Sequence, residues 1–157
     1  ELEFSAILVE GLTFYGNVGW LDIKYGEFFA DLNGDGESTD NSALELVRAP
    51  KWDMRVGLDY DFSIGNMGFI TLGVGLSYTS KMVLTVPNDF LFNREPLTTV
   101  DAQINWESAD SKYRISLWGR NLNNDIERLG GTPVGPLFAF AAPTQPRQYG
   151  IAFTADF

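Results

Sequence analysis

The sequence predicts an all-β fold, an antiparallel up-and-down transmembrane β-barrel of which this chain forms a partial barrel of about seven strands. Three observations support this expectation. Apolar and polar residues alternate along successive segments, short and long connections alternate between these segments, and aromatic residues lie at both ends of the apolar runs. Barrels of the bacterial outer membrane combine these features, because their strands face lipid on one side and a polar lumen on the other.

The first two strands are expected at residues 1–9 and 12–28, joined by a short turn at Gly11. The alternation is already present at the first residue, which is Glu1 and not Met. The chain therefore starts inside a strand. We expect it to be the carboxy-terminal segment of a longer protein, either cut from it or left after loss of the upstream part.

The next three strands, at residues 51–64, 69–84 and 97–108, show the alternation most clearly. A shift of one residue would exchange the two faces of a strand, so the pattern assigns each side chain to a face. The expected outward, apolar face includes Val56, Leu72, Leu76, Ile104 and Phe153, and the expected inward, polar face includes Asp59, Gly73, Asp101, Gln103 and Thr154.

The last two strands are expected at residues 112–122 and 147–157. In the first of these, Arg114, Trp118 and Arg120 share the polar face. The second ends the chain on an aromatic strand. Its faces carry Tyr149, Ile151, Phe153, Ala155 and Phe157 on one side, and Gln148, Gly150, Ala152, Thr154 and Asp156 on the other.

The connections alternate strictly in length. Tight turns are expected at residues 9–11, 65–68 and 108–111, and long connections rich in Gly, Pro, Asn and Asp at residues 29–50, 85–96 and 123–146. Outer-membrane barrels have short periplasmic turns and longer extracellular loops. When the carboxy terminus is placed at the periplasmic side, counting back along the strands puts all three tight turns on that side.

Aromatic residues bracket the apolar runs, as at Trp52 and Phe62 or Tyr149 and Phe157. At about 3.3 Å per residue and a tilt near 45°, these runs span on the order of 20 Å, close to the apolar band of an outer-membrane barrel. A soluble β-sandwich is the alternative, because its core also requires alternation. It does not explain aromatic residues at both ends, and an exposed apolar terminal strand promotes aggregation.

The composition excludes several function classes. Cysteine and histidine are both absent, so no disulfide, thiol nucleophile, imidazole base or typical zinc site is available. The formal charge of −10 argues against a nucleic-acid partner, which requires a basic surface. No run approaches the roughly 20 consecutive apolar residues of a transmembrane helix.

A second candidate feature is the segment Asp31 to Asp40, which places Asp31, Asn33 and Asp35 at alternate positions before Gly36. This is the first half of a calcium-binding loop, whose oxygen ligands alternate along a tight turn. The second half fails, because position 12 is Ser42 and not Glu. The pattern is consistent with a weak calcium site and also with an ordinary solvated turn.

Carboxylates on the strands permit a catalytic interpretation, in which two of Asp59, Asp61, Asp101 and Glu107 act as general acid and base. Their spacing of two instead indicates a polar lumen-facing surface, so no enzyme is expected. Arg114 and Arg120 would face the same lumen. They could meet anionic cargo or the interior of the barrel, or form ion pairs with neighbouring strands.

The carboxy-terminal third carries a more specific signal. Residues 113–122 (YRISLWGRNL), then a Pro/Gly-rich loop, then residues 146–150 (PRQYG) and the terminal aromatic strand resemble the closing hairpin of the TonB-dependent receptors of the Gram-negative outer membrane. Residues 11–16 (GLTFYG) and 48–52 (RAPKW) resemble strand starts in the same family. The resemblance covers nearly the whole chain.

The resemblance implies a barrel of about 22 strands closed by an amino-terminal plug domain, of which this chain lacks the plug and the earlier strands. The implied function is active uptake of a scarce nutrient (an iron–siderophore, a cofactor or a glycan) in the outer membrane, energised by TonB in the periplasm. It also implies that Gln148, Gly150, Phe153 and Phe157 form the signal for the barrel-assembly machinery. A passive porin or adhesin wall and a soluble binding module are the alternative functions.

Overall fold

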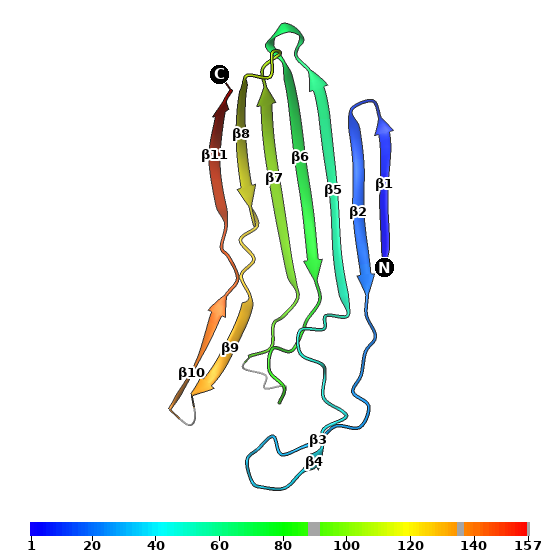
Figure 1. The fold of residues 1–157 in the computed structure, drawn as a ribbon, viewed down its shortest axis with the longest axis vertical. Helices are drawn as coiled ribbons and strands as arrows, with labels where there is room; N and C mark the ends of the chain where they lie inside the picture. Colours follow the sequence, from blue (N-terminus) through cyan, green and yellow to red (C-terminus); the bar gives the residue numbers. More distant parts are fainter. Residues whose placement is uncertain (88–91, 135–136, 157) are drawn as a thin grey trace.

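The computed structural model describes residues 1–87, 92–134 and 137–156. Seven long strands form one antiparallel sheet in the order β1-β2-β5-β6-β7-β8-β11 (Figure 1). They are β1 (Leu2–Val9), β2 (Leu12–Trp20), β5 (Trp52–Ser63), β6 (Phe69–Thr79), β7 (Leu97–Glu107), β8 (Tyr113–Arg120) and β11 (Gln148–Ala155). Each strand pairs with the next long strand along the chain, which confirms the up-and-down topology of an unclosed partial barrel.

All seven expected strands are present, but two are shorter than the alternation suggests. The second strand ends at Trp20, where it pairs with Trp52, the first residue of β5. The fourth ends at Thr79, and beyond it only an isolated bridge joins Met82 to Arg94. Both strands stop where the neighbouring strand starts or ends, because continued alternation cannot extend a strand that has no partner.

Two small hairpins were not expected from the sequence. One pairs β3 (Phe29–Ala30) with β4 (Thr39–Asp40), and the other pairs β9 (Arg128–Val134) with β10 (Phe138–Pro143). The long connections over residues 29–50 and 123–146 therefore contain paired segments that the sequence did not predict. Glycine and proline, which are depleted in strands, interrupt the apolar pattern of β9 and so conceal it.

The tight turns and the carboxy terminus lie at one end of the sheet, and the long connections lie at the other (Figure 1). We call these the tight-turn end and the long-loop end. The three tight turns follow β1, β5 and β7, and the turn after β5 contains the short 3₁₀ helix η1 (Gly65–Met67). This arrangement agrees with the direction of the strands expected from the sequence.

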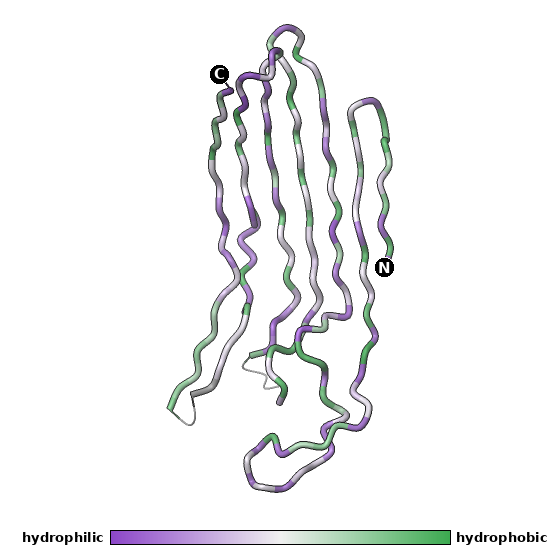
Figure 2. Tube along the Cα trace, viewed as in Figure 1, coloured by the Kyte–Doolittle hydropathy of each residue, from purple (hydrophilic) through white to green (hydrophobic). Residues whose placement is uncertain are grey.

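The register separates the two faces as the alternation predicts. Leu72 pairs with Tyr60 and Ile104, while the adjacent residue Gly73 pairs with Asp59 and Gln103. Leu72 and Gln103 therefore lie on opposite faces. Figure 2 shows the same alternation of hydrophobic and hydrophilic residues along the strands. We call the two sides the apolar face and the polar face.

Much of the apolar face is exposed. Val74, Ile104 and Ile151 keep 46%, 47% and 70% of their surface accessible. A β-sandwich would cover one face with a second sheet. Among the described residues the only further sheets are the two hairpins, which lie at the long-loop end (Figure 1). The sandwich alternative is therefore wrong. No helix among the described residues is long and apolar enough to cross a membrane.

The apolar face predicts a large effect of charge at Leu72. Leu72→Arg places a guanidinium among apolar side chains. It should lower the free energy of unfolding by about 2–4 kcal/mol if residue 72 lies near the bilayer midplane, and by less toward the interface. Thr71→Arg is the matched control, since Thr71 lies one residue away on the polar face and pairs with Asp61. Folding of the intact barrel into lipid vesicles, measured by denaturant titration, should show the loss at Leu72 only. Equal losses would mean that neither face contacts lipid.

Candidate functional site

The polar face is shaped by glycines that large side chains cover. A Cβ atom added at Gly57 would lie 2.6 Å from the Tyr15 hydroxyl oxygen, and one at Gly150 would lie 2.6 Å from the Trp118 ring. Each aromatic ring therefore lies flat across the glycine of the neighbouring strand. A larger residue at either position would meet the ring and force it to move.

Polar side chains converge in the middle of this face. A Cβ atom at Gly73 would lie 2.8 Å from Asp59 Oδ1 and 3.0 Å from Gln103 Nε2, so both side chains lean over Gly73 from the two neighbouring strands. They line a shallow hollow of about 450 Å³ together with Asp101 and Arg120. The hollow is a polar surface for the interior of a barrel.

The five residues expected to face the lumen all share the polar face. Asp59 and Gln103 flank Gly73 in one row of the sheet, Asp101 pairs with Gly75, and Arg114 and Arg120 belong to the same face of β8. The structure does not bring the two arginines together, because they lie at opposite ends of β8. That this face borders a lumen stays a prediction.

The two arginines differ in their partners. Arg114 forms ion pairs with Glu107 at 3.1 Å and Asp156 at 3.5 Å, so it joins three neighbouring strands or strand ends. This is the ion-pair interpretation given above. Arg120 forms no ion pair with a described residue, and its guanidinium carbon lies 5.4 Å from the centre of the Trp118 ring. Arg120 therefore keeps donors available on the polar face.

The carboxylates on this face have mainly structural partners. Asp101 Oδ1 accepts a hydrogen bond of 2.8 Å from the Asn121 amide, and Asp61 Oδ1 accepts one from the Thr71 hydroxyl. Among the carboxylates described on this face, Asp59 is the one with a buried oxygen, Oδ1, that has no hydrogen-bond partner. The group forms no paired acid and base.

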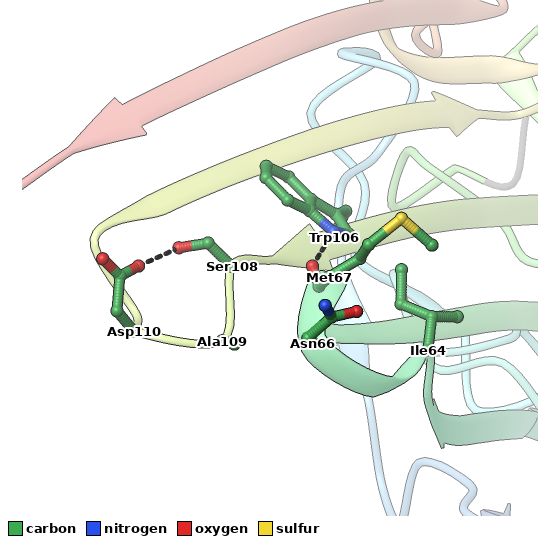
Figure 3. Close-up of a pocket in the computed structure, with 7 residues that line it drawn as sticks. All are labelled: Ile64, Asn66, Met67, Trp106, Ser108, Ala109 and Asp110. Carbon is green, nitrogen blue, oxygen red and sulfur yellow. Dashed lines mark hydrogen bonds between the residues drawn. The ribbon is translucent and has the colours of Figure 1, made fainter.

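At the tight-turn end, two turns are joined to each other (Figure 3). The Trp106 indole nitrogen donates to the Met67 carbonyl oxygen at 2.9 Å, and the Ser108 hydroxyl donates to Asp110 at 2.7 Å. Gly68, at φ 108°, contacts the Glu107 carbonyl oxygen so closely that no side chain fits there. The two turns are therefore in close contact. A pocket of about 590 Å³ lies beside this junction, and Met67 is exposed there.

The long-loop end contains the only two fully buried apolar side chains among the described residues, Val83 and Phe92, each 2% exposed. The Phe92 ring lies directly against Gly131 of β9, at a place that a Cβ atom would occupy. The connection after β6 therefore packs on the β9–β10 hairpin. The loops form a small core of their own, which the sequence did not predict.

Three arginines from three connections meet around this core. The Arg48 guanidinium donates to the Leu129 carbonyl oxygen at 3.4 Å, and the Arg128 guanidinium donates to the Asn93 carbonyl oxygen at 3.1 Å. Arg94 is only 9% exposed, and burial lowers its pKa. None of the three forms an ion pair with a described residue. The charges of Asp53 and Glu127 act on the pKa of Arg94 in the opposite direction, so the three arginines are a small group within connections that carry more acidic than basic residues.

The aromatic residues of the connections divide into two groups. Phe28 stacks on Tyr25 with ring centres 4.6 Å apart, and Phe92 is buried against Gly131, so each of these two rings packs within the connections. Phe29, Phe138 and Phe140 are about 60% exposed: 62%, 59% and 58%. Phe90 lies outside the described residues. The exposed rings are available to line a vestibule.

The Asp31 loop has part of the expected geometry. Asp31 accepts hydrogen bonds from the Gly34 and Gly36 amides at 2.6 and 2.8 Å, and these bonds, that to Gly36 most, lower the pKa of its carboxyl. Asp35 accepts one from the Glu37 amide at 2.8 Å. No group of three or more acidic, histidine or cysteine side chains suited to a metal ion occurs among the described residues. Calcium binding stays a prediction.

A polar corner, residues Asn121 to Asp125, follows β8. Asn121 is 6% exposed and lies in the left-handed region with φ 49°. Its side chain donates to the carbonyl oxygens of Asp125 at 2.8 Å and Gln145 at 2.9 Å. Asn124 accepts from the Arg147 amide at 3.0 Å. The corner therefore joins the start of the long connection to its end.

The closing strand β11 pairs with β8 from Gln148 opposite Arg120 to Ala155 opposite Tyr113. Gly150 lies under Trp118 on the polar face, and Phe153 stacks on Tyr113 with ring centres 6.3 Å apart on the apolar face. Phe157 lies outside the described residues. The assembly role of these residues stays a prediction.

Comparisons with known proteins place the fold. Residues 1–122 match the family model described as TonB dependent receptor-like, beta-barrel. The chain belongs to the TonB-dependent receptor β-barrel family. The structure is similar to the ferric yersiniabactin uptake receptor FyuA from Yersinia pestis (TM-score 0.78, 16% identity, covering 99% of this chain and 22% of that one). It is also similar to BauA, the ferric preacinetobactin receptor from Acinetobacter baumannii (TM-score 0.67, 20% identity, covering 99% and 21%).

No curated protein matches the sequence. The chain spans about a fifth of the length of the two solved receptors. The family and both receptors serve transport and not catalysis, which agrees with the expectation that no enzyme is present. Membership of the TonB-dependent receptor family also confirms the resemblance drawn from the closing hairpin.

The Asp31 loop predicts a pH-dependent, weak calcium affinity. Calorimetric titration of the intact barrel with calcium should give a binding heat that an Asp31→Ala/Asp35→Ala variant loses. Because the pKa of Asp31 lies below its ordinary value of 3.8, the carboxylate stays charged and able to bind until the pH falls through that lowered pKa. Identical binding heats for parent and variant would show that the Asp31 loop does not bind calcium and is an ordinary solvated turn.

Proposed function

We propose that this chain is part of an outer-membrane receptor of a Gram-negative bacterium that takes up a scarce nutrient actively, with energy supplied by TonB in the periplasm. The observation that carries the proposal is a seven-stranded wall of the receptor family with one continuous apolar face and one hollowed polar face. Such a wall suits lipid on one side and a lumen with a plug domain on the other.

The parts of the chain suggest a division of labour. The sheet supplies a wall whose backbone groups are paired, as the membrane requires. The polar face, with Asp59 and Arg120, offers hydrogen-bonding groups to a plug domain. The loops at the long-loop end offer the first contact for cargo. Energy coupling belongs to the plug and to TonB, and neither is contained in this chain.

For the cargo, we propose an iron–siderophore complex. Both structurally similar proteins are described as receptors for ferric siderophores. The long-loop end of this chain adds a physical reason, since it carries Arg48 and Arg128 as well as the exposed rings of Phe29, Phe138 and Phe140. Anionic chelates with flat aromatic parts suit arginine donors and ring faces. A cofactor or a glycan is the alternative cargo.

Uptake experiments on the full-length receptor test this proposal. A strain lacking the receptor should lose accumulation of a labelled ferric siderophore, and the cloned parent should restore it. Collapse of the proton-motive force or removal of TonB should stop accumulation but leave binding at the cell surface. A passive porin would keep accumulating without energy, and unchanged siderophore uptake with a lost growth response to a cofactor or glycan would overturn the cargo assignment.

The closing strand generates a second prediction, about assembly. Strand ends with free backbone groups can add to the edge of another sheet, and terminal aromatic rings prefer the membrane interface. Deleting Phe157 from the full-length receptor should therefore reduce insertion in cells while unassisted folding into detergent proceeds. Unchanged insertion in cells would show that Phe157 is only an interfacial anchor.

A further inference from the structure

We propose that the polar corner, Asn121 to Asp125, sets the register of the closing strand β11 on β8. The alternation of side chains cannot set it alone. A slip of one residue inverts the faces of a strand, but a slip of two residues restores them. Ile151 would stay on the apolar face in either register. Trp118 over Gly150 disfavours a slip, and the connection between the two strands adds a second constraint on the observed pairing.

The other strand pairs obtain this constraint from their connections or from a long, continuous pairing with both neighbours. Tight turns join β1 to β2, β5 to β6 and β7 to β8, and short turns fix hairpin register. The closing pair differs, because 27 residues, 121–147, connect β8 to β11. β11 also pairs with a described strand on one side only. Within that connection the β9–β10 hairpin has its own pairing, which leaves the register of β11 on β8 to the segments 121–127 and 144–147.

The corner replaces the missing tight turn. Asn121 holds both arms of the connection, since its amide nitrogen donates to Asp125 on the first arm and to Gln145 on the second, and its oxygen accepts from the Asp125 amide at 3.0 Å. The side chain is buried, so its hydrogen bonds have no solvent substitute. A slip would leave one donor unpaired.

Two further contacts tie the second arm to the corner. The Arg147 amide donates to Asn124 at 3.0 Å, and the Arg147 guanidinium donates to the Leu122 carbonyl oxygen at 3.3 Å. Arg147 directly precedes the first residue of β11. A shift of β11 by two residues would carry it about 6.6 Å along the strand direction, beyond the reach of the backbone contact.

The corner is itself held on β7. The Asn123 side chain accepts from the Val100 amide at 3.0 Å and donates to the Thr98 carbonyl oxygen at 2.6 Å. Asp125 accepts from the Thr98 amide at 2.9 Å. These side chains take the place of backbone partners at the edge of β7, where β8 has ended. These contacts hold the corner on the sheet, whereas the bonds of Asn121 and Asn124 join it to the second arm.

The two arms differ in length, which makes the corner specific for one register. Beyond the pair Arg120 and Gln148, the arms meet again where the Thr144 amide donates to the Glu127 carbonyl oxygen at 2.7 Å. The first arm takes seven residue steps between these points and the second arm takes four. The left-handed residues Asn121 and Asn124 coil the longer arm. A simple continuation of the ladder could not absorb this difference.

Disulfide formation between β8 and β11 in the full-length receptor tests the proposal. This chain contains no cysteine, so introduced pairs have no competitor within it. Ser116→Cys with Ala152→Cys reports the observed register, in which the two residues are paired. Ser116→Cys with Thr154→Cys, and Arg114→Cys with Ala152→Cys, report slips of two residues in either direction. Directly paired positions meet the distance that a disulfide needs, and positions two residues away do not.

The main variant is Asn121→Gly, which removes all side-chain bonds to both arms but tolerates the left-handed backbone. Asn123→Gly is the matched control. It introduces the same flexibility and loses two hydrogen bonds, but both of these lead to β7 and none to the second arm. Asn124→Gly is the milder variant, because it loses only the bond to the Arg147 amide.

We expect Asn121→Gly to raise the ratio of slipped to native disulfide about tenfold, the factor that a loss of about 1.4 kcal/mol produces. Asn124→Gly should raise it less, and Asn123→Gly should leave it unchanged. A native ratio in assembled Asn121→Gly and Asn124→Gly receptors would overturn the proposal. So would an equal rise in Asn123→Gly, since general loosening would then explain it. If Asn121→Gly does not assemble, Asn124→Gly decides alone.

Discussion

The structure depends on one constraint: its backbone amides and carbonyls must pair with each other, because lipid offers them no hydrogen-bond partner. Within lipid every unpaired amide or carbonyl costs several kcal/mol, so a wall of strands must be continuous. This chain meets the constraint between β1 and β11, but each of these edge strands has one free side among the described residues. Further strands beside it are required in a membrane, which agrees with its covering about a fifth of the similar receptors.

Once the ladder is fixed, the side chains have little freedom. Each row of the sheet must place apolar groups on one side and polar groups on the other, and several large side chains on the polar face use the space over a glycine. In three places on this face, side chains lie over a glycine of a neighbouring strand: Tyr15 over Gly57, Asp59 and Gln103 over Gly73, and Trp118 over Gly150. The hollow polar face therefore follows from the ladder, and its chemistry follows from which glycines were kept.

These dependencies explain what the sequence could predict. The alternation specified the strands and faces because the register transmits it across the sheet, as Leu72 and Gly73 show. It overestimated β2 and β6, because a strand's end depends on its partner. It missed the β9–β10 hairpin and the core around Phe92, because contacts between distant loops leave no periodic signal. The glycines beneath Tyr15 and Trp118 were visible in the sequence, but only the pairing shows which ring covers which glycine.

The corner after β8 also gives a physical meaning to the motif that carried the family resemblance. Residues 119–122 (GRNL) and 146–150 (PRQYG) lie some 25 positions apart, yet they meet in the structure. Asn121 supplies a left-handed turn and a buried amide, and Arg147 enters β11 from the other arm. The two segments depend on each other, because each supplies hydrogen-bond partners to the other. The connection between two such parts can differ in sequence while the closing strand keeps its place.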